Sequence, residues 1–390
     1  MTRQDDEGAV FEEREHALRR TGISRMTIRS LLIKATVIVG SVFIALLIGE
    51  FVTREFNLGT VRLNEMQGSV LKYKPHVRFL NRKENNNWVE TNSFGFHDAE
   101  REKTSGKYRI LFLGDSYVEG LQVPTDKLFT SVLEKRFLQN GREAECINAG
   151  VSGTGTAYQY TLWKEVFDNK VAVDHLVLAF YLGNDIENNN IDLSFPPGNE
   201  SFFVDADGKV FKYAVKESVV RSLVGHIRDH SALANTVYEM LHLAQRSERS
   251  RERAKDERVK VDYRIAKENG AGAWQVATKG TLALIKNWNL ELAGKSITMD
   301  VMVIDRPSGI YNDFESDFLE QLRAMCAQQH IGFLRLGLTT NPYEVYSFDG
   351  KVLGHFNYKG HELAAAELYD YFKSTYGDRL LPEYKRSVRR

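Results

Sequence analysis

Five short runs of apolar residues recur along the chain, separated by longer stretches with the spacing of amphipathic helices. The runs are residues 108–114 (YRILFLG), 146–149, 175–181 (HLVLAFY), 297–304 (ITMDVMVI) and 331–336. Short apolar runs bounded by glycine or polar residues predict buried strands. Helices are expected near residues 127–139, 313–329 and 358–372. Strands that alternate with helices predict an α/β fold whose parallel sheet is covered on both faces.

One long segment interrupts this alternation. Residues 186–285 separate the third predicted strand from the fourth, and we expect them to form an insertion in the domain. The sequence around Asp205-Ala206-Asp207-Gly208 predicts a hairpin turn. The highly charged residues 246–267 predict a solvated helix with ion pairs four residues apart.

The longest apolar segment lies near the N-terminus. Residues Leu31–Gly49 contain a single charge, Lys34, and a bilayer core needs roughly 20 apolar residues in a helix. A cleaved signal peptide fits poorly because the charged region before the segment is long and no A-x-A-like site follows. A buried core helix is the other alternative, but the segment is apolar on all sides. We therefore expect a transmembrane helix over residues 31–52.

The charges beside this helix predict its orientation. The apolar segment Leu31–Gly49 is preceded by Arg19, Arg20, Arg25 and Arg29 and is followed by Glu50, Arg54 and Glu55. The excess of arginine before the helix predicts a cytoplasmic N-terminus. The expected organisation is a cytoplasmic tail (residues 1–30), a single span in the inner (plasma) membrane, a juxtamembrane lead-in (53–104) and a periplasmic or extracellular domain (105–380).

The overall composition excludes some classes of partner. Lys+Arg and Asp+Glu are equal at 52 each, so no basic excess favours nucleic acid as a partner. The two cysteines, Cys146 and Cys326, do not form a disulfide framework or a zinc set. They are either buried thiols or a single disulfide. No cofactor or metal is expected, and His361 is expected on the surface of the last helix.

Four motifs with chemically useful side chains lie beside the predicted strands and the last helix. They are Gly114-Asp115-Ser116 after the first strand, residues 148–156 (NAGVSGTGT) after the second, Gly183-Asn184-Asp185 after the third, and residues 354–361 (GHFNYKGH) before the last helix. Asp305-Arg306-Pro307 follows the fourth strand and is expected at the rim of the same pocket. In a parallel sheet, function gathers at the carboxyl ends of the strands. A serine with a histidine base in reach is a nucleophile, and an asparagine amide with backbone N–H groups stabilises an oxyanion.

The order and placement of these motifs resemble the SGNH (GDSL) hydrolase superfamily over roughly residues 92–375. The lead-in Asn92–Asp98 is similar to that of envelope-anchored members. The resemblance implies a three-layer α/β/α sandwich of flavodoxin-like type. It implies Ser116 as nucleophile and His355 as base. It also implies an oxyanion hole formed by Ser116, Gly153 and Asn184, with Asp115 and Asp185 as possible supporting residues.

One position departs from the pattern of this superfamily. An aspartate usually stands three residues before the histidine, but that position here is Val352. The nearest acidic residue upstream is Asp349. Three hypotheses follow: Asp349 orients His355, a backbone carbonyl does so, or the site is impaired.

These observations predict a serine esterase that hydrolyses O-acyl esters, with O-acetyl as the expected group. An envelope or exported polysaccharide is the expected substrate. Two alternatives stay open: an O-acyltransferase that acts on a glycan, and a catalytically degenerate binding or scaffold component of an export system. The expected partners are an acylated glycan or other ester, the membrane through residues 31–52, and other envelope proteins, but no nucleic acid.

Overall fold

The computed structural model describes residues 25–194, 200–214, 219–241, 257–309, 311, 313–338 and 341–377. The chain divides into two compact units. One comprises residues 1–62 and 223–243, and the other comprises residues 63–222 and 244–390. Each unit is described by itself, beginning with the larger one.

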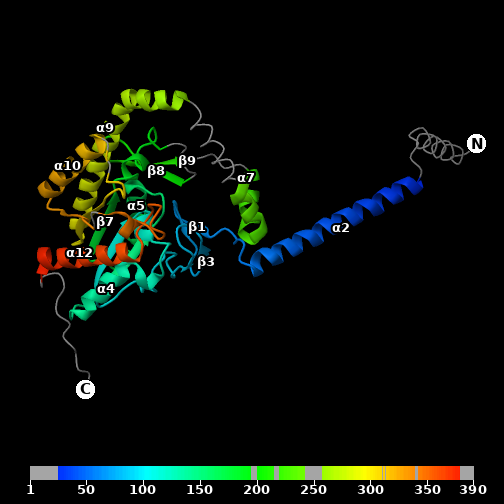
Figure 1. Ribbon diagram of the computed structural model, residues 1–390, viewed down its shortest axis with the longest axis horizontal. Coiled ribbons are helices and arrows are strands. Elements are labelled where there is room, and N and C mark those ends of the chain that lie inside the picture. Colours follow the sequence, from blue (N-terminus) through cyan, green and yellow to red (C-terminus); the bar gives the residue numbers. More distant parts are fainter. Residues whose placement is uncertain are drawn as a thin grey trace, which may run out of the picture. The chain divides into compact units, whose positions relative to one another are not determined.

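A five-stranded parallel sheet forms the centre of the larger unit (Figure 1). Its strands are β5 (Tyr108–Gly114), β6 (Ala144–Gly150), β7 (His175–Tyr181), β10 (Thr298–Ile304) and β11 (Gly332–Arg335). They lie in the order β11-β10-β7-β5-β6, which is the 2-1-3-4-5 order of flavodoxin-like sheets. The predicted α/β fold with a parallel sheet is therefore confirmed, and the five apolar runs are its strands.

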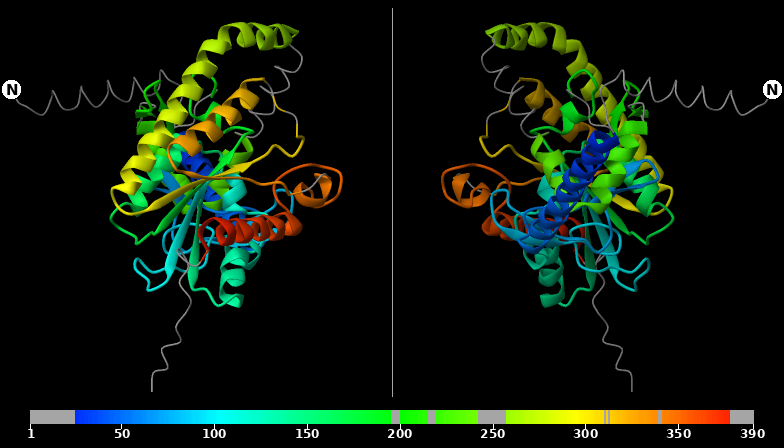
Figure 2. Two further views of the ribbon diagram at one scale, coloured as in Figure 1. Left: turned by 90° about the vertical axis from the view of Figure 1, so that its left-hand side faces the viewer. Right: turned by 90° about the vertical axis from the view of Figure 1, so that its right-hand side faces the viewer.

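Helices cover both faces of the sheet (Figure 2). Helices α4 (Phe129–Gln139) and α12 (Tyr358–Tyr376) pack on one face, whereas α5 (Thr156–Leu162), α9 (Glu257–Ala293) and α10 (Asp313–Gln328) pack on the other. The strands are mostly apolar because both of their faces are buried. Cys146 lies in one core layer and Cys326 in the other, and both are free thiols.

Two small hairpins precede the sheet. They are β1 (Asn64–Gln67) with β2 (Val70–Tyr73), and β3 (Arg78–Asn81) with β4 (Asn87–Glu90). The turn that joins β3 to β4 is attached to the loop after β5, because Asn85 Nδ2 donates to Gln122 O at 2.9 Å and Asn87 Nδ2 donates to Val123 O at 2.8 Å. These contacts place residues 82–86 beside the carboxyl edge of the sheet.

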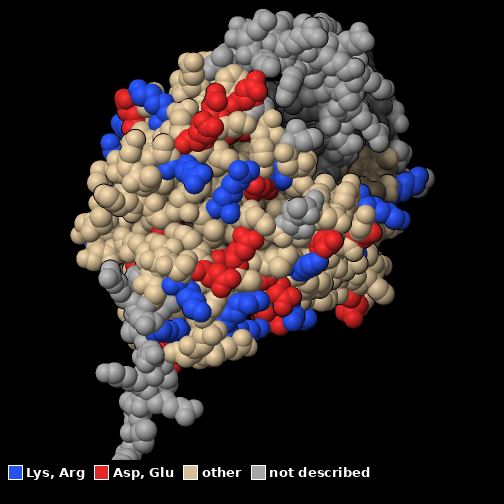
Figure 3. All heavy atoms as spheres, turned by 60° about the vertical axis from the view of Figure 1, so that its left-hand side comes forward, with Lys and Arg blue, Asp and Glu red and all other residues tan. Residues whose placement is uncertain are grey.

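The insertion contains the predicted hairpin, in which β8 (Glu200–Val204) pairs with β9 (Val210–Ala214) around residues 205–209. Residues 246–256 of the charged stretch lie outside the described residues, and residues 257–267 form the first turns of α9. The remaining short elements of this unit are α3 (Ser116–Glu119), η1 (Thr125–Lys127), η2 (Trp163–Phe167), α6 (Asp185–Asn188) and α11 (Tyr343–Tyr346). Acidic and basic side chains are interspersed on the face shown in Figure 3.

The smaller unit contains the helix α2 (Arg25–Glu55) and most of α7 (Val219–His230). Within Ile28–Glu55 of α2, the most apolar 18-residue stretch has a mean hydropathy of 2.6, and none of that stretch is buried. By length and composition, α2 is able to cross a membrane.

Candidate active site

Ser116 is the first residue of α3, and a single residue, Asp115, separates it from the end of strand β5. The Asp115 carboxylate caps this helix by accepting the Tyr117 N–H at 2.9 Å. A side chain at Gly114 would lie 2.4 Å from Val118 and 3.0 Å from Ala179. The chain therefore needs glycine at this position to turn from the strand into α3, and this turn places Ser116 at the carboxyl edge of the sheet.

The imidazole of His355 lies against this serine, with Nε2 at 2.7 Å from Ser116 Oγ. Residues near α3 fix the loop that carries the histidine. Tyr117 donates its hydroxyl to Gly354 O at 3.1 Å, and Gln122 donates its amide to Phe356 O at 3.0 Å. Because both neighbours of His355 are bonded to the segment that follows Ser116, the distance between base and hydroxyl is fixed from two sides.

The carboxylate beside His355 belongs to Glu84, in the turn between β3 and β4. Glu84 Oε1 lies 2.6 Å from His355 Nδ1, and Oε2 accepts the backbone N–H of His355 at 2.8 Å. An acceptor at Nδ1 favours the tautomer with its proton on Nδ1, which leaves Nε2 free to accept the serine proton. Ser116, His355 and Glu84 thus have the connectivity of a Ser-His-acid triad.

Asp349 does not reach His355. Its Oδ1 accepts the N–H groups of Lys351 and Val352 at 2.8 and 3.0 Å, and the Ser347 hydroxyl donates to the same atom at 3.0 Å. These bonds close a local turn, which is a common role for aspartate. The hypothesis that Asp349 orients the imidazole is therefore corrected, because Glu84 occupies that position.

Glycine at position 354 allows Glu84 to approach. A Cβ atom there would lie 2.5 Å from Glu84 Oε2, the atom that accepts the His355 N–H. Glu84 itself has a backbone φ of 61°, a conformation that is uncommon and costly for residues other than glycine. Strained backbone of this kind concentrates at functional sites.

The predicted oxyanion-hole residues follow three adjacent strands. Gly153 lies in the loop after β6 with φ of 72°, and its N–H forms no hydrogen bond with the part of the chain that the structure describes. Asn184 precedes α6, but its side chain does not cap that helix; it is close enough to the Asp115 carboxylate, next to Ser116, to favour the ionised form of that group. Since β6, β5 and β7 are neighbours, both residues come from loops that flank Ser116.

Glu119 is a buried carboxylate that the sequence reasoning missed. It lies at the end of α3, with a side chain that is 2% exposed, and it accepts the hydroxyl of Ser152. Thr154 Oγ1 also donates to Val151 O at 2.7 Å, and Val151 N–H donates to Gly114 O at 3.0 Å. Burial raises the pKa of Glu119 to about 7. Glu119 therefore positions the loop that carries Gly153.

Acidic groups surround the imidazole. Burial by itself would lower the pKa of His355, but the hydrogen bond and charge of Glu84, with the charges of Asp115 and Glu119, outweigh burial and raise it. Burial raises the pKa of Asp115 to about 6. Burial and the nearby Asp115 raise the pKa of Asp185 well above its usual range. Glu84, Asp115 and Glu119 favour an imidazolium at position 355, the species that forms when a histidine takes a proton from a nucleophile.

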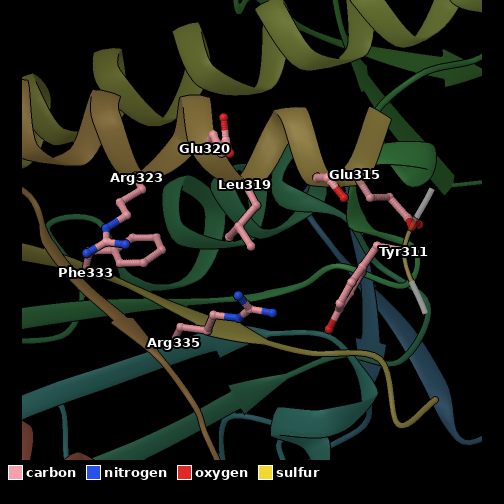
Figure 4. Close-up of a pocket in the computed structure, with 8 residues that line it drawn as sticks. Tyr311, Glu315, Leu319, Glu320, Arg323, Phe333 and Arg335 are labelled. Atoms are coloured by element: carbon pink, nitrogen blue, oxygen red, sulfur yellow. The ribbon is translucent and has the colours of Figure 1, made fainter. Parts of the chain in front are cut away.

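Arg306 connects the loop of Asn184 to a neighbouring pocket. Its Nη2 donates to Gly183 O at 3.1 Å, and the same group pairs with the buried carboxylate of Glu315 on α10. Glu315 lines a cavity of about 490 Å³ between α10 and β11, together with Tyr311, Leu319, Arg323, Phe333 and Arg335 (Figure 4). Arg306 therefore ties the Asn184 loop to α10, but the lining of this cavity includes neither Arg306 nor a residue of the predicted site, so the prediction that Asp305-Arg306-Pro307 lines the rim of the catalytic pocket stays a prediction.

His361 is fully buried, contrary to its expected place on the helix surface. Its Nδ1 accepts the N–H of Phe129, the first residue of α4, at 3.1 Å. Burial lowers the pKa of His361 to about 3, so this histidine is a neutral acceptor that joins α12 to α4.

The fold and the site together define a doubly wound α/β protein with a Ser-His-Glu array at the carboxyl edge of its sheet. No protein-family model and no curated protein matches the sequence. The chain is similar to several solved structures. With TesA it shares 12% identity and a TM-score of 0.37, over 68% of this chain and 98% of that one.

Two further similar structures are an esterase and an acetylxylan esterase. The esterase EstA from Pseudoalteromonas sp. is 10% identical, with a TM-score of 0.38 over 69% of this chain and 98% of that one. The acetylxylan esterase Axe2 from Geobacillus stearothermophilus is 12% identical, with a TM-score of 0.37 over 70% of this chain and 96% of that one.

Proposed function

We propose that this protein is a serine ester hydrolase in which Ser116 is the nucleophile and His355 the general base. The observation that carries the proposal is the continuous chain of contacts from Ser116 Oγ through the two nitrogens of His355 to Glu84, at 2.7 and 2.6 Å. Contacts of this length between nucleophile, base and orienting acid are the geometric mark of activated serine nucleophiles.

The reaction proceeds through an acyl-enzyme. Ser116 Oγ bonds to the ester carbonyl carbon while its proton passes to His355 Nε2, and the carbonyl oxygen becomes an oxyanion. The C–O bond to the alcohol then breaks, and His355 returns the proton to the leaving oxygen. A water molecule attacks the acyl-enzyme by the same route and releases the acid.

The other residues of the site stabilise the charges that form during the reaction and hold Ser116 and His355 in place. Glu84 fixes the tautomer of His355 and stabilises its positive charge after proton transfer. The N–H groups of Ser116 and Gly153 and the amide of Asn184 are the proposed donors to the oxyanion, and a single donor of this kind is worth about 3 kcal/mol. Asp115 contributes by capping the helix that begins at Ser116.

We propose an O-acyl ester on a glycan outside the cytoplasm as the substrate, with O-acetyl as the group removed. The resemblance of the four sequence motifs to the SGNH hydrolases supports the ester. The apolar segment of α2, preceded by several arginines, supports a single membrane span with its N-terminus inside the cell and the hydrolase domain outside.

The proposal is tested with the full-length protein in detergent, by p-nitrophenyl acetate hydrolysis and fluorophosphonate labelling. Wild type should hydrolyse the ester and take up one label, whereas Ser116→Ala should lose both. The loss of rate should be up to about 10⁶-fold, as in a protease whose nucleophile is removed. Ser374→Ala is a matched control, because this exposed serine at the end of α12 lies outside the site.

The same assay separates the alternatives. An acylated glycan incubated with the protein should release free acid; gain of ester on a deacylated glycan would instead indicate transfer from the same acyl-enzyme. If wild type is neither labelled nor active, the hydrolase proposal fails and a binding or scaffold function takes its place.

A further inference from the structure

In the smaller unit, helix α7 exposes a stripe of apolar side chains, while its polar face binds another residue of the same unit. On α7, Val220, Leu223 and Ile227 are 70%, 59% and 46% exposed, and their spacing places them on one face. Asp229 lies on the opposite face and binds the guanidinium of Arg62 at 2.8 and 3.0 Å. In a helix of a water-soluble domain the apolar face is the buried one, so α7 has the reverse arrangement.

The helix that follows, residues 232–241, continues this apolar surface. Val237, Met240 and Leu241 are 48%, 62% and 60% exposed. They share a face with Leu233, which contacts α2, since a Cβ atom at Gly49 would lie 2.9 Å from Leu233 Cδ2. The exposed surface therefore begins beside the last apolar turns of α2.

Hydrogen bonds fix the corner between the two helices to the end of α2. The Glu50 carboxylate accepts the N–H groups of Ala232 and Leu233, both at 2.9 Å, and the Ser231 hydroxyl at 2.8 Å. Arg54 donates to His230 O at 2.9 Å. Glu50 directly follows the apolar segment Leu31–Gly49. The corner therefore lies at the level where α2 would leave a bilayer.

Other side chains at this level have the same character. Phe51, Phe56 and Leu58 are 63%, 66% and 57% exposed. The guanidinium carbon of Arg228 lies 3.7 Å from the centre of the Tyr238 ring, in a cation–π contact. Tyrosine and arginine are both suited to the boundary between lipid and water. Lipid is the favoured occupant of the apolar surface because this surface is continuous with the exposed apolar face of α2.

We propose that α7 and helix 232–241 lie in the interfacial layer of the membrane that α2 crosses, with Leu223, Ile227, Val237, Met240 and Leu241 in the boundary between acyl chains and headgroups. The inference rests on α2 as a membrane span and not on hydrolysis. Amphipathic helices bind at this depth through their apolar faces. Together with α2 they would attach the smaller unit to the bilayer at two places, which fixes the rotation of α2 about its axis.

The test uses the full-length protein in phosphatidylcholine–phosphatidylglycerol vesicles, with the polarity-sensitive fluorophore NBD on single introduced cysteines. The native cysteines are buried, and unsubstituted protein gives the background labelling. The probed variants are Leu223→Cys and Met240→Cys. Ser222→Cys is the matched control, because it neighbours Leu223 but is an exposed position on the polar face. Val42→Cys, in α2, reports on the span.

Lipids with a shallow doxyl quencher should quench NBD at 223 and 240 at least about twofold more than at 222, while aqueous iodide should favour 222. Equal quenching at 222 and 223 would overturn the inference. So would protection of 223 from both quenchers, which would indicate a protein partner or a second copy. Position 42 is probed with a deep doxyl quencher. If that lipid quenches position 42 and the shallow one does not quench 223, the span stands and the interfacial helices do not; if neither lipid quenches position 42, both fail. None of these outcomes depends on esterase activity.

Discussion

Glu84 contacts His355 through both of its carboxylate oxygens, one at the ring Nδ1 (2.6 Å) and one at the backbone N–H (2.8 Å). The second contact fixes the carboxylate relative to the main chain as well as to the imidazole. An acid three residues before the histidine, at the position of Val352, is therefore not required for this contact.

The first prediction concerns this contact. Glu84→Gln keeps the size of the side chain but removes the charge that stabilises the imidazolium, and kcat should fall by about 10²–10⁴, by analogy with the protease in which the triad aspartate was replaced. Steady-state hydrolysis of p-nitrophenyl acetate measures it. Asp349→Asn is the control and should stay within about twofold of wild type, because asparagine can still close the turn at 349–352. A reversed pattern would return the orienting role to Asp349.

The second prediction concerns pH. His355 acts as a base only when neutral, and its pKa is raised above the ordinary 6.5 by Glu84, Asp115 and Glu119. The plot of kcat/KM against pH should therefore fall on the acid side with an inflection above 6.5. In Glu84→Gln, burial still lowers the pKa of His355, but the hydrogen bond to the charged Glu84 carboxylate, the main cause that raises this pKa, is gone. The inflection should therefore move to lower pH. An inflection at the same pH in both proteins would count against the pairing.

A third prediction separates catalysis from stability. The methyl group of Gly354→Ala would displace the Glu84 carboxylate, the mobile end of a side chain, so the fold should persist while the contact with His355 is lost. We expect kcat to fall by at least about tenfold and Tm to change by no more than about 2 °C. Gly106→Ala, with open space around the new methyl group, should change neither. Loss of folding in Gly354→Ala would show that the glycine is required for other reasons.

The fourth prediction concerns Glu119, whose pKa rises from 4.5 when unfolded to about 7 in the fold because of burial. The folded state thus binds this proton more tightly than the unfolded state, so the contribution is present at acid pH and is lost as pH rises from about 4.5 to 7. Glu119→Gln should gain stability relative to wild type across this range, by on the order of 3 kcal/mol. Urea unfolding at several pH values measures it. For Glu320→Gln, at an exposed position, the difference in unfolding free energy from wild type should not change with pH. If the difference for Glu119→Gln does not change with pH either, the raised pKa of Glu119 is refuted.

The strands and the place of Ser116 at the edge of the sheet could be predicted from the sequence because their signals are local. Strand β5 is an unbroken apolar run that ends at Gly114-Asp115-Ser116, and a parallel sheet gathers such turns at one edge. His361 could also have been placed, since it shares a face with the buried Ala364, Ala365 and Leu368 at helical spacing. The prediction that it lies on the surface was wrong because it followed from the absence of metal-ligand spacing and not from this helical pattern.

Glu84 could not be predicted in the same way. Its turn contains three successive asparagines and predicts only a loop, and the contact with His355 depends on how the lead-in packs against residues 121–123. Proximity in the sequence favoured Asp349, which instead forms hydrogen bonds within its own turn. A tertiary contact of this kind leaves no periodic pattern in a single sequence.

The sequence separation of the three site residues has a consequence for biosynthesis. His355 follows Ser116 by 239 residues and Glu84 by 271, and the chain is made from the N-terminus onward. A nascent polypeptide therefore presents its acid and its hydroxyl long before its base exists. Ribosome-bound intermediates that end before residue 355 lack the complete array, so Ser116 has no imidazole partner until His355 has been made.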